Sequence, residues 1–464
     1  MAWDGCDGSD IVEMVANHCW TGLLSNSVDS CFTEDGYVSF WKMRRDACHQ
    51  ELCEAEAALG CVAYPDSADF QAADLSCDGD NEETSHDSLQ GRLLNIDSPW
   101  GKEEIYFADF GPIDSFRSVR LPSGGFVLAW LHEGSIGFYH SSFAASTAGW
   151  NWQAEPVLSE GVKYVALLTN GGGQPVLFAS REDSLLATVL ADEEDTSTLP
   201  YQVSLSGQWN GGAIEVKQLA SGPYVLATGS GVSGCQSGWD IWLLSERMDS
   251  ASQKVSLLPS GDCIGMVSMV DTAAGAVVIW DEWTAAGVIE PTTSESRLLA
   301  LQLDSEGTAI GEPVVLVLEE RICDHNGCFR PSIASLGDVG FVLVWISDGA
   351  DTKTAKARLL GPDLATIGES FSVNLRGDVV SPVAIVSEPS REEFMATWVG
   401  CSIDSVPFPD VCEVGTSPPF LEACAVFGQR FNKAGGRLWK RCNNGVCDED
   451  EDCSSCPKDC GICN

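Results

Sequence analysis

The feature that most constrains this 464-residue chain is a two-part phrase that occurs six times. Each copy has a short apolar run, a turn that is usually centred on glycine, and a second apolar run that often ends in tryptophan. Two such runs joined by a few turn residues are typical of a β-hairpin. The copies lie at residues 118–130, 164–179, 216–228, 267–280, 331–345 and 383–398. The period is about 50 residues, which indicates a repeat architecture.

Each copy continues with a third strand-like run, and most add a shorter fourth one. Four antiparallel strands in each of six units predict a six-bladed β-propeller, in which sheets pack face to face around an axis. The last unit lacks an obvious fourth strand. The run Arg92–Ile96 or the run Glu104–Phe110 is expected to supply it and to form a seam between the two ends of the propeller. A seventh blade built from this segment is the alternative.

The repeated tryptophans Trp130, Trp280, Trp345 and Trp398 are interpreted as packing residues. A large aromatic side chain at the end of a strand buries roughly 150 to 250 Å² between sheets. The second and third copies lack tryptophan at this position, which argues against a repeated ligand pocket.

The chain divides into four parts by composition. Residues 1–76 show helical spacing of apolar positions and good helix formers, and predict a disulfide-rich helical module. Residues 77–91 form an acidic linker, residues 92–438 the propeller, and residues 439–464 a cysteine-rich module.

Twenty cysteines predict an oxidising compartment. Seven precede the propeller, seven lie within it and six lie in the tail. Because the number of cysteines before the propeller and the number within it are both odd, at least one disulfide must join these two groups, or two thiols must stay free. The first residues have neither the basic start nor the apolar core of a signal peptide. We therefore expect the mature or trimmed form of an exported protein.

The charge balance excludes some partners. With 68 acidic and 26 basic residues the formal net charge is −42. A nucleic acid or an anionic membrane face is therefore not expected as a partner. No apolar run is long enough for a membrane span. The acid excess fits a solvated surface, with cation binding as the alternative.

The tail carries the most specific motif, RCNNGVCDEDEDCSSCPKDCGICN. It resembles a cysteine-rich module, Asn-Gly-Val-Cys followed by Glu-x-Cys and Cys-Pro-x-Asp-Cys-Gly, that recurs in secreted and surface proteins of bacteria. Asp450 departs from the glycine that is common there. The phrase at Pro331–Trp345 is similar to the propeller repeats of bacterial surface proteins. These resemblances imply a secreted or cell-surface location, and they imply no activity.

Carboxylates in this tail are candidate metal ligands. Calcium prefers hard oxygen ligands, so Ca²⁺ is the cofactor that they would suit. The alternative is a cluster of exposed acids. The candidates are Asp448, Asp450, Asp452 and Asp459. The segment Cys323–Cys328 is interpreted as a disulfide-closed turn rather than a metal site.

Three insertions interrupt the repeat at residues 229–240, 281–296 and 400–424. All three lie between the second and third strands, so they are expected on one face, where binding loops of repeat scaffolds usually lie. Their aromatic and acidic side chains suit a sugar or a protein partner. The candidates are Trp239, Asp240, Asp281, Glu282, Trp283, Phe408, Asp410 and Phe420. The alternative is that these loops only cap the blades, pinned by bridges such as Cys235–Cys263 and Cys401–Cys412.

Sequence signatures of catalysis are absent. The chain lacks a phosphate loop, a zinc-protease helix, a nucleophile elbow and a dinucleotide fingerprint. We therefore expect an exported or cell-surface binding or adhesion protein with a glycan or protein ligand. The alternatives are a subunit of an extracellular assembly, formed by self-assembly, and an enzyme acting on glycans or peptides.

Overall fold

The computed structural model describes five short stretches near the start of the chain and most of residues 113–437. The stretches are 12–13, 24–32, 36–45, 86–95 and 98–110. The gaps within 113–437 are 123–124, 142–151, 159–160, 191–200, 204–211, 233–234, 249, 258–262, 284–295, 319–322, 325–326, 329, 349–352, 375–377, 380, 389–391 and 403–422.

All six copies of the sequence phrase form antiparallel hairpins, as predicted. The first strands are β6 (Ile113–Arg120), β10 (Val162–Thr169), β14 (Ile214–Gln218), β18 (Cys263–Thr272), β24 (Ser332–Ser335) and β29 (Ala384–Glu388). The second strands are β7 (Phe126–His132), β11 (Pro175–Arg181), β15 (Tyr224–Val232), β19 (Gly275–Trp283), β25 (Phe341–Asp348) and β30 (Glu393–Ser402).

Glycine is required at the start of two of the second strands. Gly275 has φ of 155° and Gly340, just before β25, has φ of 125°. A Cβ atom at either position would lie 2.0 Å from a carbonyl oxygen of the third strand, that of Leu303 or of Leu360. The third strand therefore packs too closely for any side chain, which explains the glycine in these turns of the sequence phrase.

Third and fourth strands complete the units. The third strands are β8 (Ser135–Ser141), β12 (Leu185–Val189), β16 (Cys235–Leu244), β20 (Ser296–Asp304), β26 (Lys353–Leu360) and β31 (Ala423–Asn432). The fourth strands are β9 (Trp152–Leu158), β13 (Tyr201–Val203), β17 (Ala251–Leu257), β21 (Ala309–Leu318) and β27 (Thr366–Ser372). The units β14–β17 and β18–β21 join into one sheet through the single pair Gln236 and Ile264.

The front segment also forms strands, and the prediction of a helical module is wrong for residues 24–32 and 36–45. These residues are β2 (Leu24–Phe32) and β3 (Gly36–Arg45), and they form an antiparallel sheet with β4 (His86–Asn95) and β5 (Ser98–Phe110). The run from Tyr37 to Trp41 is rich in aromatic and β-branched residues, and β3 pairs with β4 along its whole length. Cross-strand pairing here outweighs the helical spacing.

The predicted domain boundaries shift accordingly. Residues 86–91, expected in the acidic linker, belong to β4. The other parts of the predicted helical module and linker, except Val12–Glu13, lie outside the described residues, as does the cysteine-rich tail after residue 437.

A seam joins the start and the end of the described chain, but the segment that forms it differs from the predicted one. The last sheet contains β28 (Asp378–Val379), β29, β30 and β31, and its outermost strand β31 pairs with β1 (Val12–Glu13). The described part of the first predicted run, residues 92–95, lies instead in β4, and the run Glu104–Phe110 lies in β5, the strand that pairs with β4. Both runs therefore belong to the sheet β2–β5 and not to the last unit.

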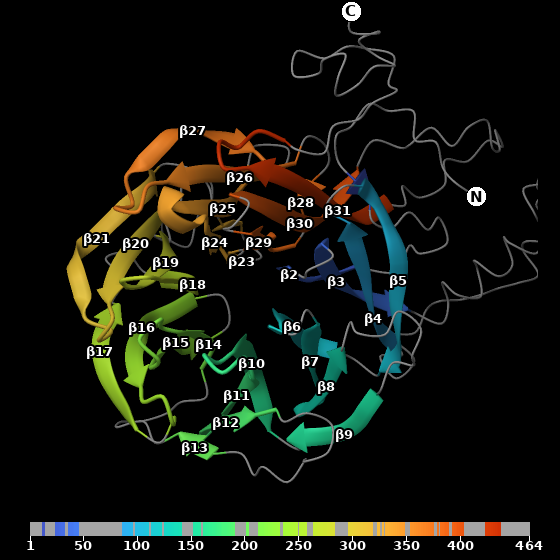
Figure 1. Cartoon of the computed structure of the whole chain (residues 1–464), viewed down its shortest axis with the longest axis horizontal. Helices are drawn as coiled ribbons and strands as arrows, with labels where there is room; N and C mark the ends of the chain where they lie inside the picture. The colour runs from blue at the N-terminus through green and yellow to red at the C-terminus, as the bar shows by residue number, and fades with distance from the viewer. Residues whose placement is uncertain are drawn as a thin grey trace, which may run out of the picture.

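The sheets follow one another around a ring (Figure 1). Successive first strands contact each other in the order β2, β6, β10, β14, β18, β24 and β29, and β2 contacts β29. These contacts return to their starting point, so the first strands line the inside of the ring.

The core lies between neighbouring sheets. One cluster joins Trp239 and Ile241 of β16 to Val278 and Trp280 of β19. Others hold Trp345 and Trp398. The exposed fractions of the repeated tryptophans are 3% for Trp130, 2% for Trp280, and 1% for Trp345 and Trp398. The prediction that they are packing residues is confirmed.

No α-helix is found in the described part of the chain, and hence no helix there is long and apolar enough to cross a membrane.

Candidate functional site at the insertion-bearing end

The two ends of the ring carry different connections. At the hairpin end, first strands turn into second strands and third strands into fourth ones. At the insertion-bearing end, second strands lead into third strands, and each unit connects to the next. Residues 284–295 leave β19 there and residues 403–422 leave β30. Both segments lie outside the described residues, but their roots are directly paired: Trp283 lies opposite Ser296, and Ser402 opposite Ala423.

The insertion at residues 229–240 is mostly not a loop, contrary to the prediction. β15 and β16 extend through it and pair from Gly229 with Trp239 to Val232 with Cys235. Trp239 is therefore not exposed: its side chain is 1% accessible and packs in the core between two units. Its Nε1 donates a hydrogen bond of 2.9 Å to the carbonyl oxygen of Gly265.

Gly265 lies in a bulge of β18, where the register with β19 shifts between Ile264 and Val267. A Cβ atom there would lie 2.2 Å from Oδ2 of Asp281. The Asp281 carboxylate accepts a hydrogen bond from the backbone of Met266, the other residue of the bulge. The bulge is thus held from one side by Trp239 and from the other by Asp281, two residues that the sequence suggested as ligand contacts.

Asp281 is fully buried, which also contradicts its expected exposure. Burial raises the pKa of its carboxyl group from 3.8 to about 7, and the neighbouring charge of Glu282 contributes to the increase. Backbone hydrogen bonds act in the opposite direction but are outweighed. Alternation of apolar and polar residues could not have shown this burial, because the bulge of β18 lies against the Asp281 carboxylate.

Glu282 is 4% exposed and is held by two neighbours. Its Oε1 accepts a hydrogen bond of 3.1 Å from Nε1 of Trp280. Its Oε2 accepts hydrogen bonds from Arg297, at 2.7 Å from Nη2 and 3.1 Å from Nε. Arg297 lies opposite Glu282 on β20, next to the root of the segment 284–295. This pair fixes the base of that segment.

Asp240 is the predicted ligand residue that remains partly accessible in the described structure. Its Oδ1 accepts hydrogen bonds from Nε2 of Gln253 at 2.7 Å and from Oγ of Ser256 at 2.6 Å, both on β17. Asp240 therefore joins a polar cluster on the outer part of its sheet rather than the group around Asp281.

The remaining predicted site residues are not described by the structure. The side chain of Trp283 lies outside the described residues, as do the whole residues Phe408, Asp410 and Phe420 and the candidate metal ligands Asp448, Asp450, Asp452 and Asp459. Within the described part, no three His, Cys, Asp or Glu side chains cluster as a metal site.

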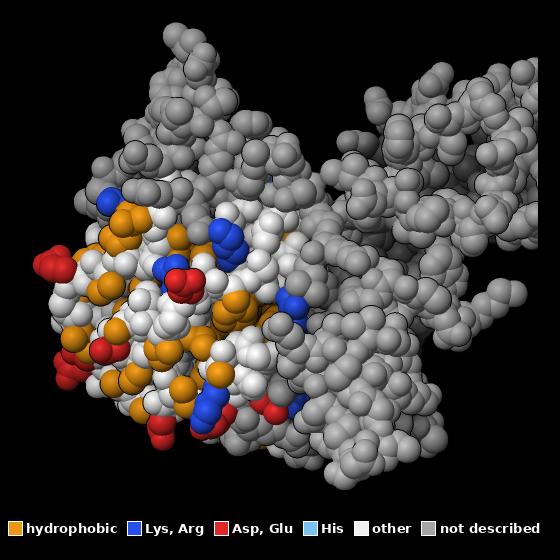
Figure 2. All heavy atoms as spheres, turned by 90° about the horizontal axis from the view of Figure 1, so that it is seen from above, with side chains coloured by type: hydrophobic (Ala, Val, Ile, Leu, Met, Phe, Trp, Pro, Cys, Tyr) orange, Lys and Arg blue, Asp and Glu red, His pale blue; other side chains and the backbone are white. Residues whose placement is uncertain are grey.

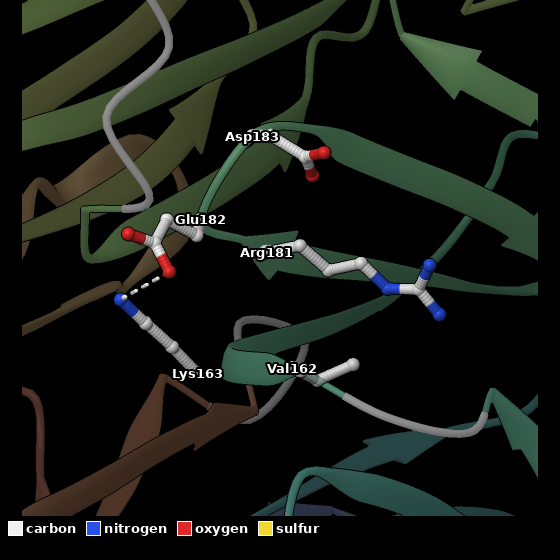
Figure 3. Close-up of a pocket in the computed structure, with 6 residues that line it drawn as sticks. Val162, Lys163, Arg181, Glu182 and Asp183 are labelled. Carbon is white, nitrogen blue, oxygen red and sulfur yellow. Dashed lines mark ion pairs between the residues drawn. The ribbon is translucent and has the colours of Figure 1, made fainter.

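A shallow hollow of about 370 Å³ lies at the same end (Figure 3). It is lined by residues 161–163, around the start of β10, and residues 181–183, around the end of β11. The Lys163 ammonium lies 3.8 Å from Oε2 of Glu182. Sequence reasoning missed this group because no motif marks it: the hollow forms where one unit connects to the next.

Comparisons with known proteins give no family. The chain matches no protein-family model and no curated protein. Among solved structures it is similar to a protein of unknown function from Dyadobacter fermentans, with a TM-score of 0.42 and 10% identity over 91% of this chain and 98% of the other.

Two further solved structures are similar to a comparable degree. A putative 6-phosphogluconolactonase from Bacteroides uniformis gives a TM-score of 0.41 and 9% identity over 76% of this chain and 88% of that one. A puromycin-hydrolyzing peptidase of Mycobacterium tuberculosis gives 0.48 and 10% over 92% and 55%. Likenesses at this level carry no argument about the activity of this chain.

Proposed function

We propose that this chain is an exported, seven-bladed β-propeller that binds a glycan or protein ligand at its insertion-bearing end. We infer seven blades, the alternative to the six expected from the repeat, because the sheet β2–β5 adds a four-stranded unit before the first repeated one. The contacts among first strands, which return from β29 to β2, support this count.

The observation that carries the binding proposal is the contrast between rigid roots and long segments at one end. The roots of 284–295 and 403–422 are paired strand ends, and the first is fixed by the ion pair between Glu282 and Arg297. Loops mounted on a rigid scaffold are where binding residues concentrate. The undescribed candidates Phe408, Asp410 and Phe420 belong to the second segment.

Export is supported by the register of two cysteine pairs. Cys323 lies opposite Cys328 in the small hairpin β22 (Cys323–Asp324) and β23 (Gly327–Cys328), and Cys401 lies opposite Cys424 at the root of 403–422. Directly opposite Cα atoms are about 4.5 to 5.5 Å apart, a separation that a disulfide spans. The register thus favours a bridge from Cys401 to Cys424 over the expected one to Cys412.

A second candidate function, a subunit of an extracellular assembly, is favoured by exposed apolar side chains on the outer strands. Ile310, Val314, Val315 and Leu318 of β21 and Ile367 of β27 are 41 to 62% exposed. Figure 2 views the molecule from the top edge of Figure 1, near β27, and shows apolar side chains among scattered charges on this rim. Light scattering during chromatography tests whether the chain self-assembles.

The binding proposal is tested by excising each long segment. Because Trp283 and Ser296 are directly paired, residues 284–295 can be replaced by a two-residue Asn-Gly turn, and residues 403–422 likewise. We expect the wild type to bind members of a glycan and protein array, and at least one excision to abolish that binding. The same array probed in the presence of a calcium chelator tests whether binding requires Ca²⁺.

The matched control changes the hairpin end: Ala273→Asn with Ala274→Gly alters the turn between β18 and β19 and should leave binding unchanged. Full binding by both excised variants would contradict the proposal. Failure of the wild type to bind anything, together with ordered self-assembly, would favour the second candidate.

A further inference from the structure

An ion pair inside the ring connects units that are not neighbours. Glu215 on β14 pairs with Arg330, which immediately precedes Pro331 and β24. The two side chains are 13% and 20% exposed. Nε of Arg330 also donates a hydrogen bond of 2.9 Å to Oγ of Ser268 on β18, the strand between them. Ser268 in turn donates to the carbonyl oxygen of Pro331 at 2.6 Å.

Two more cations act on Glu215. Burial raises the pKa of Glu215, but the charges of Arg330, Lys217 and Arg117 and a hydrogen bond from Arg330 lower it below the ordinary value. Lys217 lies two residues further along β14, and Arg117 lies on β6. Since β10 lies between β6 and β14, and β18 between β14 and β24, these charges meet inside the ring.

The charge balance of this axial cluster, Arg117, Glu215, Lys217 and Arg330, is opposite to that of the chain. It has three cations and one carboxylate, in a protein of formal charge −42. Among the described residues, no carboxylate forms a salt bridge with Lys217. Partly buried positive charge is costly unless an anion balances it.

We propose that the axial cluster binds an oxyanion, a carboxylate, sulfate or phosphate group, on the inside of the ring near the insertion-bearing end. Arginine presents a planar array of donors that suits such groups, and lysine adds a point charge. The oxyanion competes with Glu215 for Arg330. This site goes beyond the proposed function, because it is built from first strands and not from the inserted segments. It accepts either a free ion or the acidic group of a larger ligand.

The test uses sodium sulfate and sodium glucuronate as probes, with glucose as the neutral reference. Binding is followed by titration calorimetry at low ionic strength, on the full chain. We expect saturable binding of at least one anion, and a roughly tenfold or larger loss in Lys217→Gln, as for one charged hydrogen bond. Lys254→Gln is the matched control: it removes the same charge from an exposed position on β17 and should bind as the wild type does.

A second variant distinguishes an anion-binding site from an ion pair that only stabilises the fold. Glu215→Gln removes the competing carboxylate, so anion affinity should rise severalfold; a merely structural ion pair would lose stability with no gain in affinity. Identical anion titrations for wild type, Lys217→Gln and Lys254→Gln would overturn the proposal, as would equal binding of glucose.

The two sources of the oxyanion give different positive results. Tighter binding of glucuronate than of sulfate, weakened when residues 284–295 or 403–422 are excised, identifies the acidic group of a larger ligand. Equal binding of both probes, unaffected by excision, identifies a free ion. Glycan or protein binding at the inserted segments without any anion response would leave the proposed function intact and overturn this inference alone.

Discussion

The hairpin end and the insertion-bearing end of the ring follow different structural rules. At the hairpin end one backbone hydrogen bond recurs from unit to unit: Leu121, Leu219 and Leu336 each donate to the carbonyl oxygen four residues later, at 2.8 Å in every case. At the insertion-bearing end the described contacts differ between units, and they involve charged side chains such as Glu282 and Arg330. The hairpin end repeats one backbone bond from unit to unit, although it also holds the largely buried ion pair of Arg430 and Glu393. The insertion-bearing end holds partly buried charges in a different setting in each described unit.

The difference between the two ends indicates where residues that matter for function are to be sought. A turn that repeats the same backbone bond is selected for geometry, so its side chains carry little information about a ligand. Contacts that occur once in the ring are not needed for the repeat itself, and they are better candidates for function or for fixing a functional loop.

The largest expected effect is the pH dependence contributed by Asp281 at the insertion-bearing end. Its pKa is raised on folding from 3.8 to about 7, so the folded state favours the protonated form. The resulting stability is fully present below pH 4 and is lost as the pH rises through 7. The loss is about 4 kcal/mol for a shift of this size.

Asp281→Asn carries no titrating group at this site. We expect its free energy of unfolding in urea to match that of the wild type closely only below about pH 4. The excess over the wild type should grow from about 1.5 kcal/mol at pH 5 to about 4 kcal/mol at pH 8. Equal pH profiles of the two proteins would show that Asp281 does not titrate in this range.

The second largest effect is expected for Gly275, at the hairpin end, where the turn leaves no room for a side chain. Gly275→Ala places a methyl group against the carbonyl oxygen of Leu303 at a positive φ, and should destabilise the fold by about 3 kcal/mol. Gly311→Ala is the control, because Gly311 also has a positive φ, 78°, but open space around it. Its cost should be about 1 kcal/mol, measured by urea unfolding. Similar losses in both variants would mean that backbone strain alone, rather than close packing, requires Gly275.

The smallest effect compares one ion pair from each end. Arg297→Met leaves the buried Glu282 carboxylate without its cation and should cost about 2 kcal/mol, less than a fully buried pair because Arg297 is partly exposed. Lys433→Met removes the cation of the pair with Glu392 at the hairpin end, where both side chains are nearly half exposed. That loss should stay below about 1 kcal/mol. If Lys433→Met costs as much as Arg297→Met, burial of the carboxylate does not decide how much an ion pair contributes here.

Much of the strand framework could be predicted from the sequence, because it depends on local patterns. Every hairpin of the repeated phrase forms, and the tryptophans at the ends of its second strands are buried. The helical prediction for residues 36–45 is wrong because the run from Tyr37 to Trp41 fits both helical spacing and strand propensity. Only its pairing with β4 decides between the two.

The candidate site was less predictable. Trp239 and Asp281 look like loop residues in the sequence, yet Trp239 packs against the next unit and Asp281 is fully buried. The bulge at Gly265 and Met266 connects the two side chains. The axial cluster has no motif at all. Its four members come from residues 117, 215, 217 and 330, and the curvature of the ring brings them together.

Local sequence patterns and composition are enough to predict the repeat, the hairpins, the packing role of the tryptophans and the strongly acidic charge. The tertiary structure is needed to show that β2–β5 add a sheet, that β1 pairs with the last unit, and that Asp281 is buried. It also brought Arg117, Lys217 and Arg330 around Glu215. These outcomes depend on contacts between residues far apart in the chain, which a local pattern does not specify.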